Sequence, residues 1–107
     1  MSQLELYRPA LYLSAEERER VGRLARHLRA RMMELEENGL EIRDFREEEG
    51  LVSVAAPDQE NLAGRLRWEH GIHGKPIQDG VELWVNPRTA FEELDGVWGA
   101  LYELLCE

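Results

Sequence analysis

The chain has 107 residues and a formal net charge of −9, from 13 basic against 22 acidic side chains, and is expected to form one domain, residues 1–107. Its charge repels nucleic acid and anionic lipid, and no apolar run approaches the roughly 20 residues that cross a bilayer, so neither is expected as a partner. The N-terminus lacks a secretory signal and the single Cys106 has no internal disulfide partner, so a soluble cytoplasmic protein is expected.

Residues 1–13 are predicted to form an extended N-terminal segment. Its leucines fall in two alternating pairs on either side of Pro9, namely Leu4, Leu6, Leu11 and Leu13. Because apolar side chains need cover in so small a chain, we expect the segment to lie on an edge of a sheet or across its exposed face.

Residues 14–38 are predicted to form a long amphipathic helix. Ser14 is the expected N-cap, Glu17 stands three positions later as its capping-box partner, and Gly39 follows the helix end. The apolar residues recur at spacings of three and four: Val21, Leu24, Leu28, Met32 and Leu35.

The next segment predicts two strands and a second helix. Residues 40–45 and 51–56 are short runs that favour strands, and a charged connector ending in glycine between them favours an antiparallel pair. Asp58 is expected to cap a helix that runs to His70 and ends at Gly71.

The last third predicts an irregular stretch, one strand and a final helix. Residues 74–76 are expected to be irregular, and residues 81–86 alternate with a period of two. Leu83 and Val85 therefore share one face of the sheet, and Trp84 points to the other. Thr89 and Glu92 form the expected capping box of the final helix. Its predicted apolar stripe comprises Phe91, Leu94, Val97, Trp98, Leu101, Tyr102 and Leu105.

This order of elements favours the α+β class. We expect a small, mostly antiparallel sheet with about three helices packed chiefly on one face. The opposite face of the sheet then needs some other cover.

Two stretches carry a resemblance to a known family. Residues 61–72 (NLAGRLRWEHGI) and residues 80–87 (GVELWVNP), the latter followed by a capped helix, resemble the C-terminal small domain of class V PLP-dependent aminotransferases and cysteine desulfurases. The resemblance covers residues 14–107 and implies the fold of that small domain. In the family, the large domain carries the Schiff-base lysine and the PLP phosphate site.

The resemblance also implies where a substrate would be held. An arginine in the closing strand of the family's small domain grips the substrate carboxylate, and Trp84 occupies that position here. An indole cannot form a bidentate fork with a carboxylate. Arg88, four residues later, is a weak candidate for the substrate-carboxylate contact.

No catalytic, cofactor-binding or metal site is predicted in the chain itself. Lys75 is the only lysine and is expected to be an exposed loop residue rather than a Schiff-base site. His70 and His73 stand on either side of the expected helix end, so they are not expected to converge on one metal ion.

Trp68 and Trp84 are the candidate interface residues. Trp68 lies off the inward side of its helix, and aromatic side chains that point outward are enriched in interfaces. For Trp84 the alternatives are a contact with another protein, most simply a second copy, or cover by the N-terminal segment of the same chain.

Two hypotheses about function follow. The first is a stand-alone, non-catalytic domain that acts through protein contacts, most simply as a homo-oligomer. Here the extended character of residues 4–13 is the favouring feature, because in the family this region would continue a helix from the large domain. The second is the C-terminal portion of a class V aminotransferase or desulfurase-type enzyme, as a fragment or a split chain. That portion would shape a substrate site, with PLP held by a large-domain partner.

Overall fold

The computed structural model describes residues 3–107, which form one five-stranded sheet and three α-helices. The strand order is β1-β4-β5-β3-β2, and every neighbouring pair is antiparallel except β1 with β4. The elements are β1 (Leu4–Leu6), α1 (Ala15–Met33), η1 (Glu36–Asn38), β2 (Glu41–Arg46), η2 (Glu47–Glu49), β3 (Leu51–Ala55), α2 (Leu62–His70), β4 (Ile72–Ile77), β5 (Gly80–Trp84) and α3 (Phe91–Leu105).

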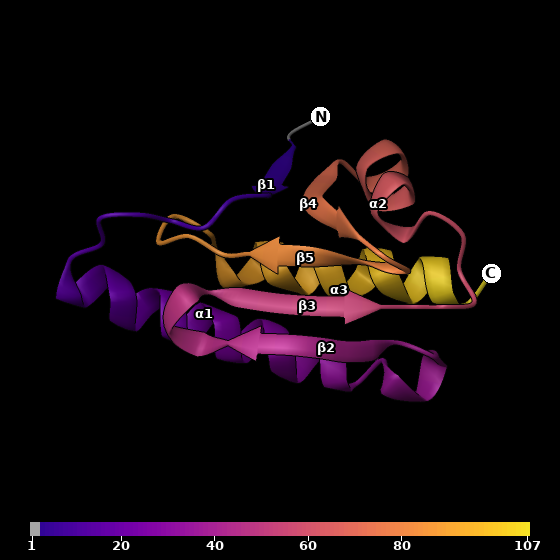
Figure 1. Cartoon of the computed structure of the whole chain (residues 1–107), viewed down its shortest axis with the longest axis horizontal. Coiled ribbons are helices and arrows are strands. Elements are labelled where there is room, and N and C mark those ends of the chain that lie inside the picture. The colour runs from indigo at the N-terminus through magenta and orange to yellow at the C-terminus, as the bar shows by residue number, and fades with distance from the viewer. Residues whose placement is uncertain (1–2) are drawn as a thin grey trace.

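The helices α1 and α3 lie behind the sheet in Figure 1, and α2 lies beside β4, to its right in this view. None of the described helices covers the face turned toward the viewer, which we call the open face. The predicted fold class is confirmed: the protein is α+β, with a mostly antiparallel sheet and its helices chiefly on one side. No helix among the described residues is both long and apolar enough to cross a membrane.

The core lies between the sheet and the helices α1 and α3. Val81 and Leu83 of β5 are fully buried, and the strand register places them opposite Val54 and Val52 of β3. This alternation is the one that the sequence predicts. The helices add the buried residues Val21, Leu24, Leu28, Met32, Leu94, Val97 and Leu101.

The predicted start of α1 is confirmed. The backbone N–H of Glu17 donates to Ser14 Oγ at 3.1 Å, and the N–H of Ser14 donates to Glu17 Oε1 at 3.0 Å. Both bonds satisfy donors that the first helical turn cannot pair internally. The α-helix ends at Met33, before the predicted residue 38, and Gly39 follows η1 with a φ of 99°.

Two predicted helix caps were wrong. The helix α2 begins at Leu62, with Asn61 and not Asp58 at the N-cap, where the Asn61 side chain accepts a hydrogen bond from the Gly64 N–H at 3.3 Å. The helix α3 begins at Phe91, and the N–H of its N-cap residue, Ala90, donates to Glu93 Oε1 at 2.8 Å.

Thr89 has a different role from the predicted cap. Its hydroxyl accepts a hydrogen bond from the Asn86 N–H at 3.1 Å, which ties the turn after β5 together. The helix therefore starts one residue later. The predicted stripe is confirmed at Leu94, Val97 and Leu101 and is wrong at Tyr102, which is exposed, and it omits the buried residues Ala100 and Leu104.

Residues 74–76, predicted to be irregular, belong to β4. Lys75 and Pro76 pair with Glu82 and Val81 of β5. Proline is tolerated at sheet edges because it has no N–H to donate. The strand β1 pairs with β4 only as far as Gly74, so Pro76 lies where β4 is itself an edge.

The N-terminal segment begins as the edge strand β1. Leu4 and Leu6 lie opposite Ile72 and Gly74 of β4, and the Leu6 side chain is fully buried in the core. Beyond β1 the chain continues along the loop between β5 and α3 before it enters α1 (Figure 1).

Candidate functional site

The open face carries Trp84 on β5, between β3 and β4. The indole N–H donates to Glu82 Oε1 at 3.3 Å, so these side chains, two residues apart, lie on the same side of the strand. Leu51 and Ser53 of β3 are their register partners and are buried. The Trp84 side chain is itself half-buried, which leaves part of the indole accessible.

An apolar hollow of about 340 Å³ borders Trp84. One wall is the N-terminal segment 9–13, which therefore flanks the half-buried indole. Arg18, Glu48 and Glu49 supply the charged rim. We call this the Trp84 hollow.

Tyr12 protrudes from the wall of the Trp84 hollow. Its side chain is 99% exposed and the neighbouring Leu11 is 69% exposed. The backbone of Tyr12 has a φ of 60°, a left-handed conformation that is uncommon for a bulky residue. Such strain costs about 1–3 kcal/mol and persists only where the surroundings enforce it.

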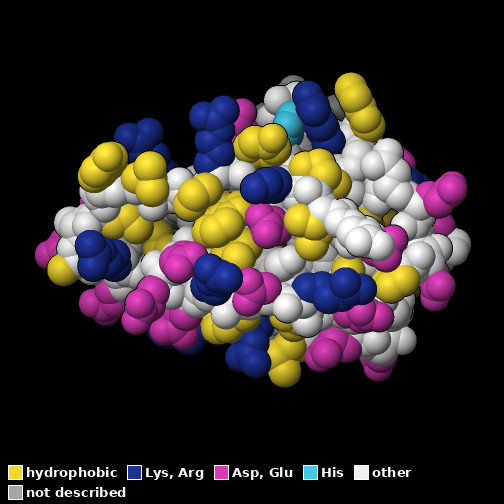
Figure 2. Space-filling model, viewed as in Figure 1, with side chains coloured by type: hydrophobic (Ala, Val, Ile, Leu, Met, Phe, Trp, Pro, Cys, Tyr) yellow, Lys and Arg dark blue, Asp and Glu magenta, His cyan; other side chains and the backbone are white. Residues whose placement is uncertain are grey.

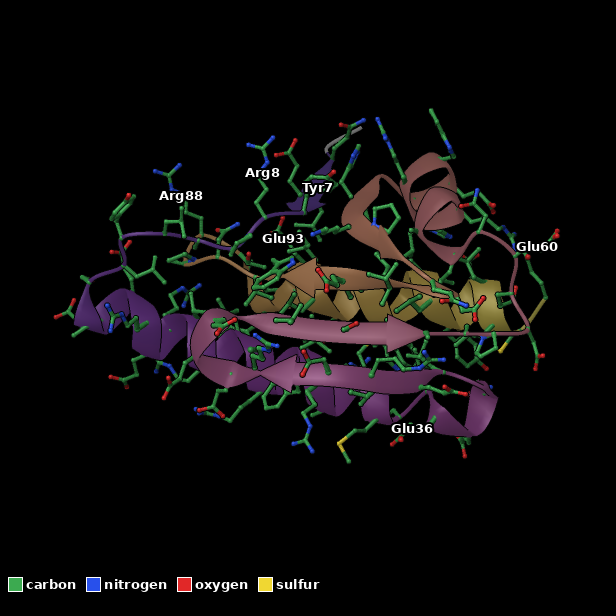
Figure 3. All side chains as sticks on the ribbon, viewed as in Figure 1. Tyr7, Arg8, Glu36, Glu60, Arg88 and Glu93 are labelled. Carbon is green, nitrogen blue, oxygen red and sulfur yellow. The ribbon has the colours of Figure 1, made fainter. Side chains whose placement is uncertain are left out.

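A second, larger concavity of about 840 Å³ lies between β1, β4 and α2. We call it the β1/α2 cleft. Its lining includes Tyr7, Arg8, Asn61, Arg67, Trp68 and His73, together with Asn86 from the loop after β5. Figure 3 shows Tyr7 and Arg8 side by side just beyond β1, and Figure 2 shows several Lys and Arg side chains along this upper border of the open face.

Trp68 lies in the β1/α2 cleft, off the buried side of α2, where the sequence places it. The indole is 77% exposed, and Tyr7, also lining the cleft, is 47% exposed. The Arg67 guanidinium lies 5.2 Å from the Trp68 ring centre, and the Arg8 guanidinium lies 6.0 Å from the Tyr7 ring centre. Each exposed ring of the cleft is therefore paired with a cation.

Arg88 is not brought to Trp84. Its side chain is exposed and lines neither the Trp84 hollow nor the β1/α2 cleft (Figure 3). Its backbone N–H donates to Asn86 Oδ1 at 2.8 Å, which belongs to the turn after β5.

His70 and His73 lie on different elements, because α2 ends between them at Gly71. His70 Nε2 lies 3.6 Å from Glu103 Oε2 of α3, whereas His73 lies on β4 in the cleft. Across residues 3–107, no group of three or more His, Cys, Asp or Glu side chains is placed to hold a metal ion. Lys75 is exposed, but it lies on a strand and not on the predicted loop.

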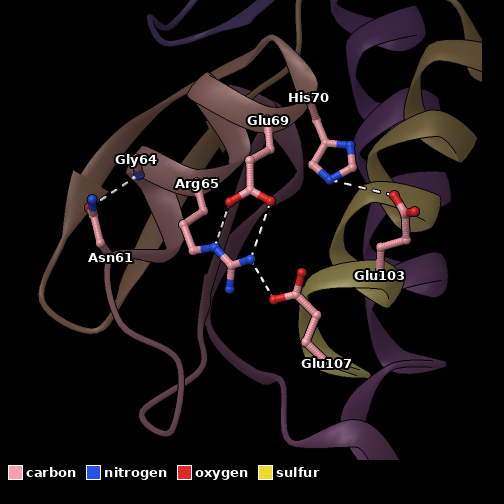
Figure 4. Close-up of polar contacts among 7 residues, drawn as sticks. All are labelled: Asn61, Gly64, Arg65, Glu69, His70, Glu103 and Glu107. Carbon is pink, nitrogen blue, oxygen red and sulfur yellow. Dashed lines mark hydrogen bonds and ion pairs between the residues drawn. The ribbon is translucent and has the colours of Figure 1, made fainter.

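A cluster of ion pairs holds α2 against the end of α3 (Figure 4). Arg65 Nε lies 2.6 Å from Glu69 Oε2 and the same guanidinium reaches Glu107. These two carboxylates accept hydrogen bonds from Arg65 and raise its pKa, while the guanidinium lowers the pKa of Glu69. Glu69 and Glu107 are exposed and Arg65 is half-buried, and solvent-exposed ion pairs of this kind contribute little to the stability of a fold.

Tyr7 and Arg8 are cleft residues that the sequence reasoning missed. The available signal was the alternation of Leu4 and Leu6, which places Glu5 and Tyr7 together on the opposite side of an edge strand. Their neighbours across the cleft come from a parallel pairing of residues almost seventy positions apart in sequence, and no local pattern indicates such a pairing.

No protein-family model matches the sequence, and comparison with curated proteins finds no match. Among solved structures, the chain is similar to the crystal structure of an alanine–glyoxylate aminotransferase from Nostoc sp., at 26% identity and a TM-score of 0.50. The match covers 78% of this chain and 25% of the aminotransferase, so the chain spans about a quarter of that protein's length. This similarity supports a fold like the small domain of a PLP-dependent transferase, and it does not extend to the class of reaction.

Proposed function

We propose that the chain is a non-catalytic domain of the aminotransferase small-domain type, and that its open face binds a second copy of the chain. The observation that carries this proposal is a self-complementary pair of features on one face: the protruding Tyr12 and the apolar Trp84 hollow beside it.

Both features suit a contact with two-fold symmetry. In such a contact the same patch serves both copies, so Tyr12 of each copy can enter the hollow of the other at the same time. A hollow of about 340 Å³ is large enough for an aromatic side chain. The strained backbone of Tyr12 holds its ring outward at a cost that burial in an interface would offset.

The charges at the hollow also favour a second copy. A chain with a net charge of −9 repels itself at long range, so a dimer needs opposite charges placed locally. Arg18 lies on the same rim as Glu48 and Glu49. A two-fold axis through the hollow would bring Arg18 of one copy toward these carboxylates of the other.

The replacement of an expected arginine by Trp84 supports a non-catalytic role. The indole donates its one N–H to Glu82 and has no second donor with which to fork a carboxylate. Lys75 is exposed on β4 with Glu82 as its register partner, and an exposed lysine has no surroundings that would prepare it as a nucleophile.

The chain is therefore expected to form no site-specific adduct with PLP. Incubation with PLP, borohydride reduction and mass spectrometry should show no stoichiometric product that persists when a competing amine is present. A stoichiometric adduct on Lys75 that resists the competing amine would contradict the non-catalytic role.

The dimer is tested with two substitutions in the proposed contact. Tyr12→Ser and Trp84→Glu should each weaken association by about 2 kcal/mol or more, which is roughly 30-fold in Kd, because each removes or charges an aromatic anchor. Light scattering over a concentration series measures the effect. Met33→Ser is the matched control, because Met33 is also exposed but lines a different concavity, near Trp98 and Tyr102.

A wild type that stays monomeric at high micromolar concentration would contradict the dimer. A dimer that neither Tyr12→Ser nor Trp84→Glu weakens would contradict it equally, provided that circular dichroism shows both variants to be folded.

A second candidate function is a portion of a class V PLP-dependent enzyme that shapes a substrate site held by a large-domain partner. The similarity to a quarter of an aminotransferase favours this reading. A truncated large domain encoded beside this gene, together with a monomeric chain, would support it over the homodimer.

A further inference from the structure

We propose that the β1/α2 cleft binds a small anionic ligand that carries a planar ring, of the chemical class of an aromatic carboxylate. The cleft shares no lining residue with the Trp84 hollow, so this site is independent of the proposed dimer.

The cleft has the size and construction of a ligand site. Its volume of about 840 Å³ lies within the range of roughly 300–1,000 Å³ found for small-molecule sites. Its walls come from the edge strand β1 and from the consecutive elements α2 and β4, which lie far from β1 in sequence, so the fold brings these side chains together.

The arginines of the cleft are free to bind an anion. Arg8 and Arg67 have no carboxylate within ion-pair distance among the described residues, although the chain has an excess of acidic side chains. Glu5 is the one carboxylate among the lining residues. A guanidinium fits a carboxylate with two parallel hydrogen bonds, which makes an unpaired arginine in a cleft a natural anion contact.

The amides of the cleft also present donors. Asn61 Oδ1 already accepts from the Gly64 N–H, and Asn86 Oδ1 already accepts from the Arg88 N–H. The NH₂ group of each amide therefore remains to donate. His73 Nε2 is buried in the structure without a hydrogen-bond partner. The accessible amide and guanidinium donors therefore favour a ligand that is rich in acceptors, as a carboxylate is, whereas His73 Nε2 has almost no exposed surface and is not counted among the ligand contacts.

The exposed aromatic side chains of the cleft indicate that the ligand carries a planar ring in addition to its charged group. Tyr7 and Trp68 present exposed rings in the cleft. A planar ring can stack on such surfaces, while the adjacent guanidiniums hold the charged group. A bare inorganic anion would use the arginines and leave both rings in water.

The test is a titration with indole-3-acetate followed by nuclear magnetic resonance. We expect saturable shifts of the Trp68 indole N–H and of backbone amides that line the cleft, with a Kd on the order of 0.1–1 mM, which suits a small, partly exposed ligand. The double variant Arg8→Gln with Arg67→Gln should weaken binding at least about ten-fold, because it removes both charge-assisted contacts. Arg23→Gln is the control, an exposed arginine on α1 outside the cleft.

Three results would overturn the site: no saturation, equal affinity for neutral indole-3-acetamide, or unchanged affinity in the double arginine variant. Equal affinity for inorganic phosphate would show that the ring is not recognised and would overturn the proposed ligand class. Repeating the titration with Tyr12→Ser separates the two proposals, because a monomeric variant should bind the ligand with unchanged affinity.

Discussion

Replacing Gly80 with alanine is expected to lower the free energy of unfolding by about 3 kcal/mol or more. Gly80 is the first residue of β5, and its register partner on the neighbouring strand β3 is Ala55. A Cβ there would overlap the carbonyl oxygen of Val54 and lie 2.7 Å from Ala55 Cα. Both obstacles are backbone atoms in the middle of the sheet, so relief requires that β3 and β5 separate.

Urea denaturation measures this effect, and Gly96→Ala is the matched control. A Cβ at Gly96 would meet nothing within 4 Å, and the residue lies in the middle of α3. Alanine there should be neutral or stabilise by up to about 1 kcal/mol, because it removes the entropic cost of glycine in a helix. Equal stability of Gly80→Ala and the wild type would contradict the close approach of β3 and β5.

Truncating Leu6 to alanine is expected to lower the free energy of unfolding by about 2–5 kcal/mol. The side chain is fully buried and belongs to the edge strand that pairs with β4. Its loss leaves a cavity in the core and weakens the attachment of β1. In the Leu6→Ala variant the amide hydrogens of residues 4–6 should also exchange faster, because β1 would detach from β4 more often.

Leu11→Ala is the control for Leu6, because Leu11 belongs to the same N-terminal segment but is largely exposed. It should leave stability within about 0.5 kcal/mol when measured at a concentration where the chain is monomeric. If Leu6→Ala were as stable as the wild type, like the control Leu11→Ala, β1 would be a loosely attached tail and not part of the sheet.

The sequence predicts the strands well where a single period decides their orientation. The alternation along β5 places Leu83 in the core and Trp84 on the open face, because a strand has only two faces. The start of α1 is predictable for a similar reason, since Ser14 and Glu17 form the one capping box that precedes its apolar stripe.

Helix starts were mispredicted where two caps compete. Asp58 and Asn61 are both good N-caps and both residue types tolerate a left-handed backbone, so the sequence does not decide between them; the helix starts after Asn61, whose φ is 53°. Near α3, the pairs Thr89–Glu92 and Ala90–Glu93 are offset by one residue. Tertiary packing selects the second pair, because Thr89 closes the turn after β5.

The candidate sites were predictable only in part. Trp68 and Trp84 stand out as aromatic residues that a local period places away from the core. Tyr12 does not stand out, because its exposure and its left-handed backbone depend on how the segment between β1 and α1 crosses the fold. The β1/α2 cleft depends on the same crossing and on parallel pairing between distant residues.

The most direct test of the proposed dimer is an isotope-filtered NOE experiment on a mixture of carbon-13-labelled and unlabelled chains. It reports contacts between copies and not within one copy. The proposed contact predicts NOEs between the Tyr12 ring of one copy and the Trp84 indole of the other. Intermolecular NOEs confined to Met33 and Tyr102, or none at a concentration where light scattering reports a dimer, would contradict it.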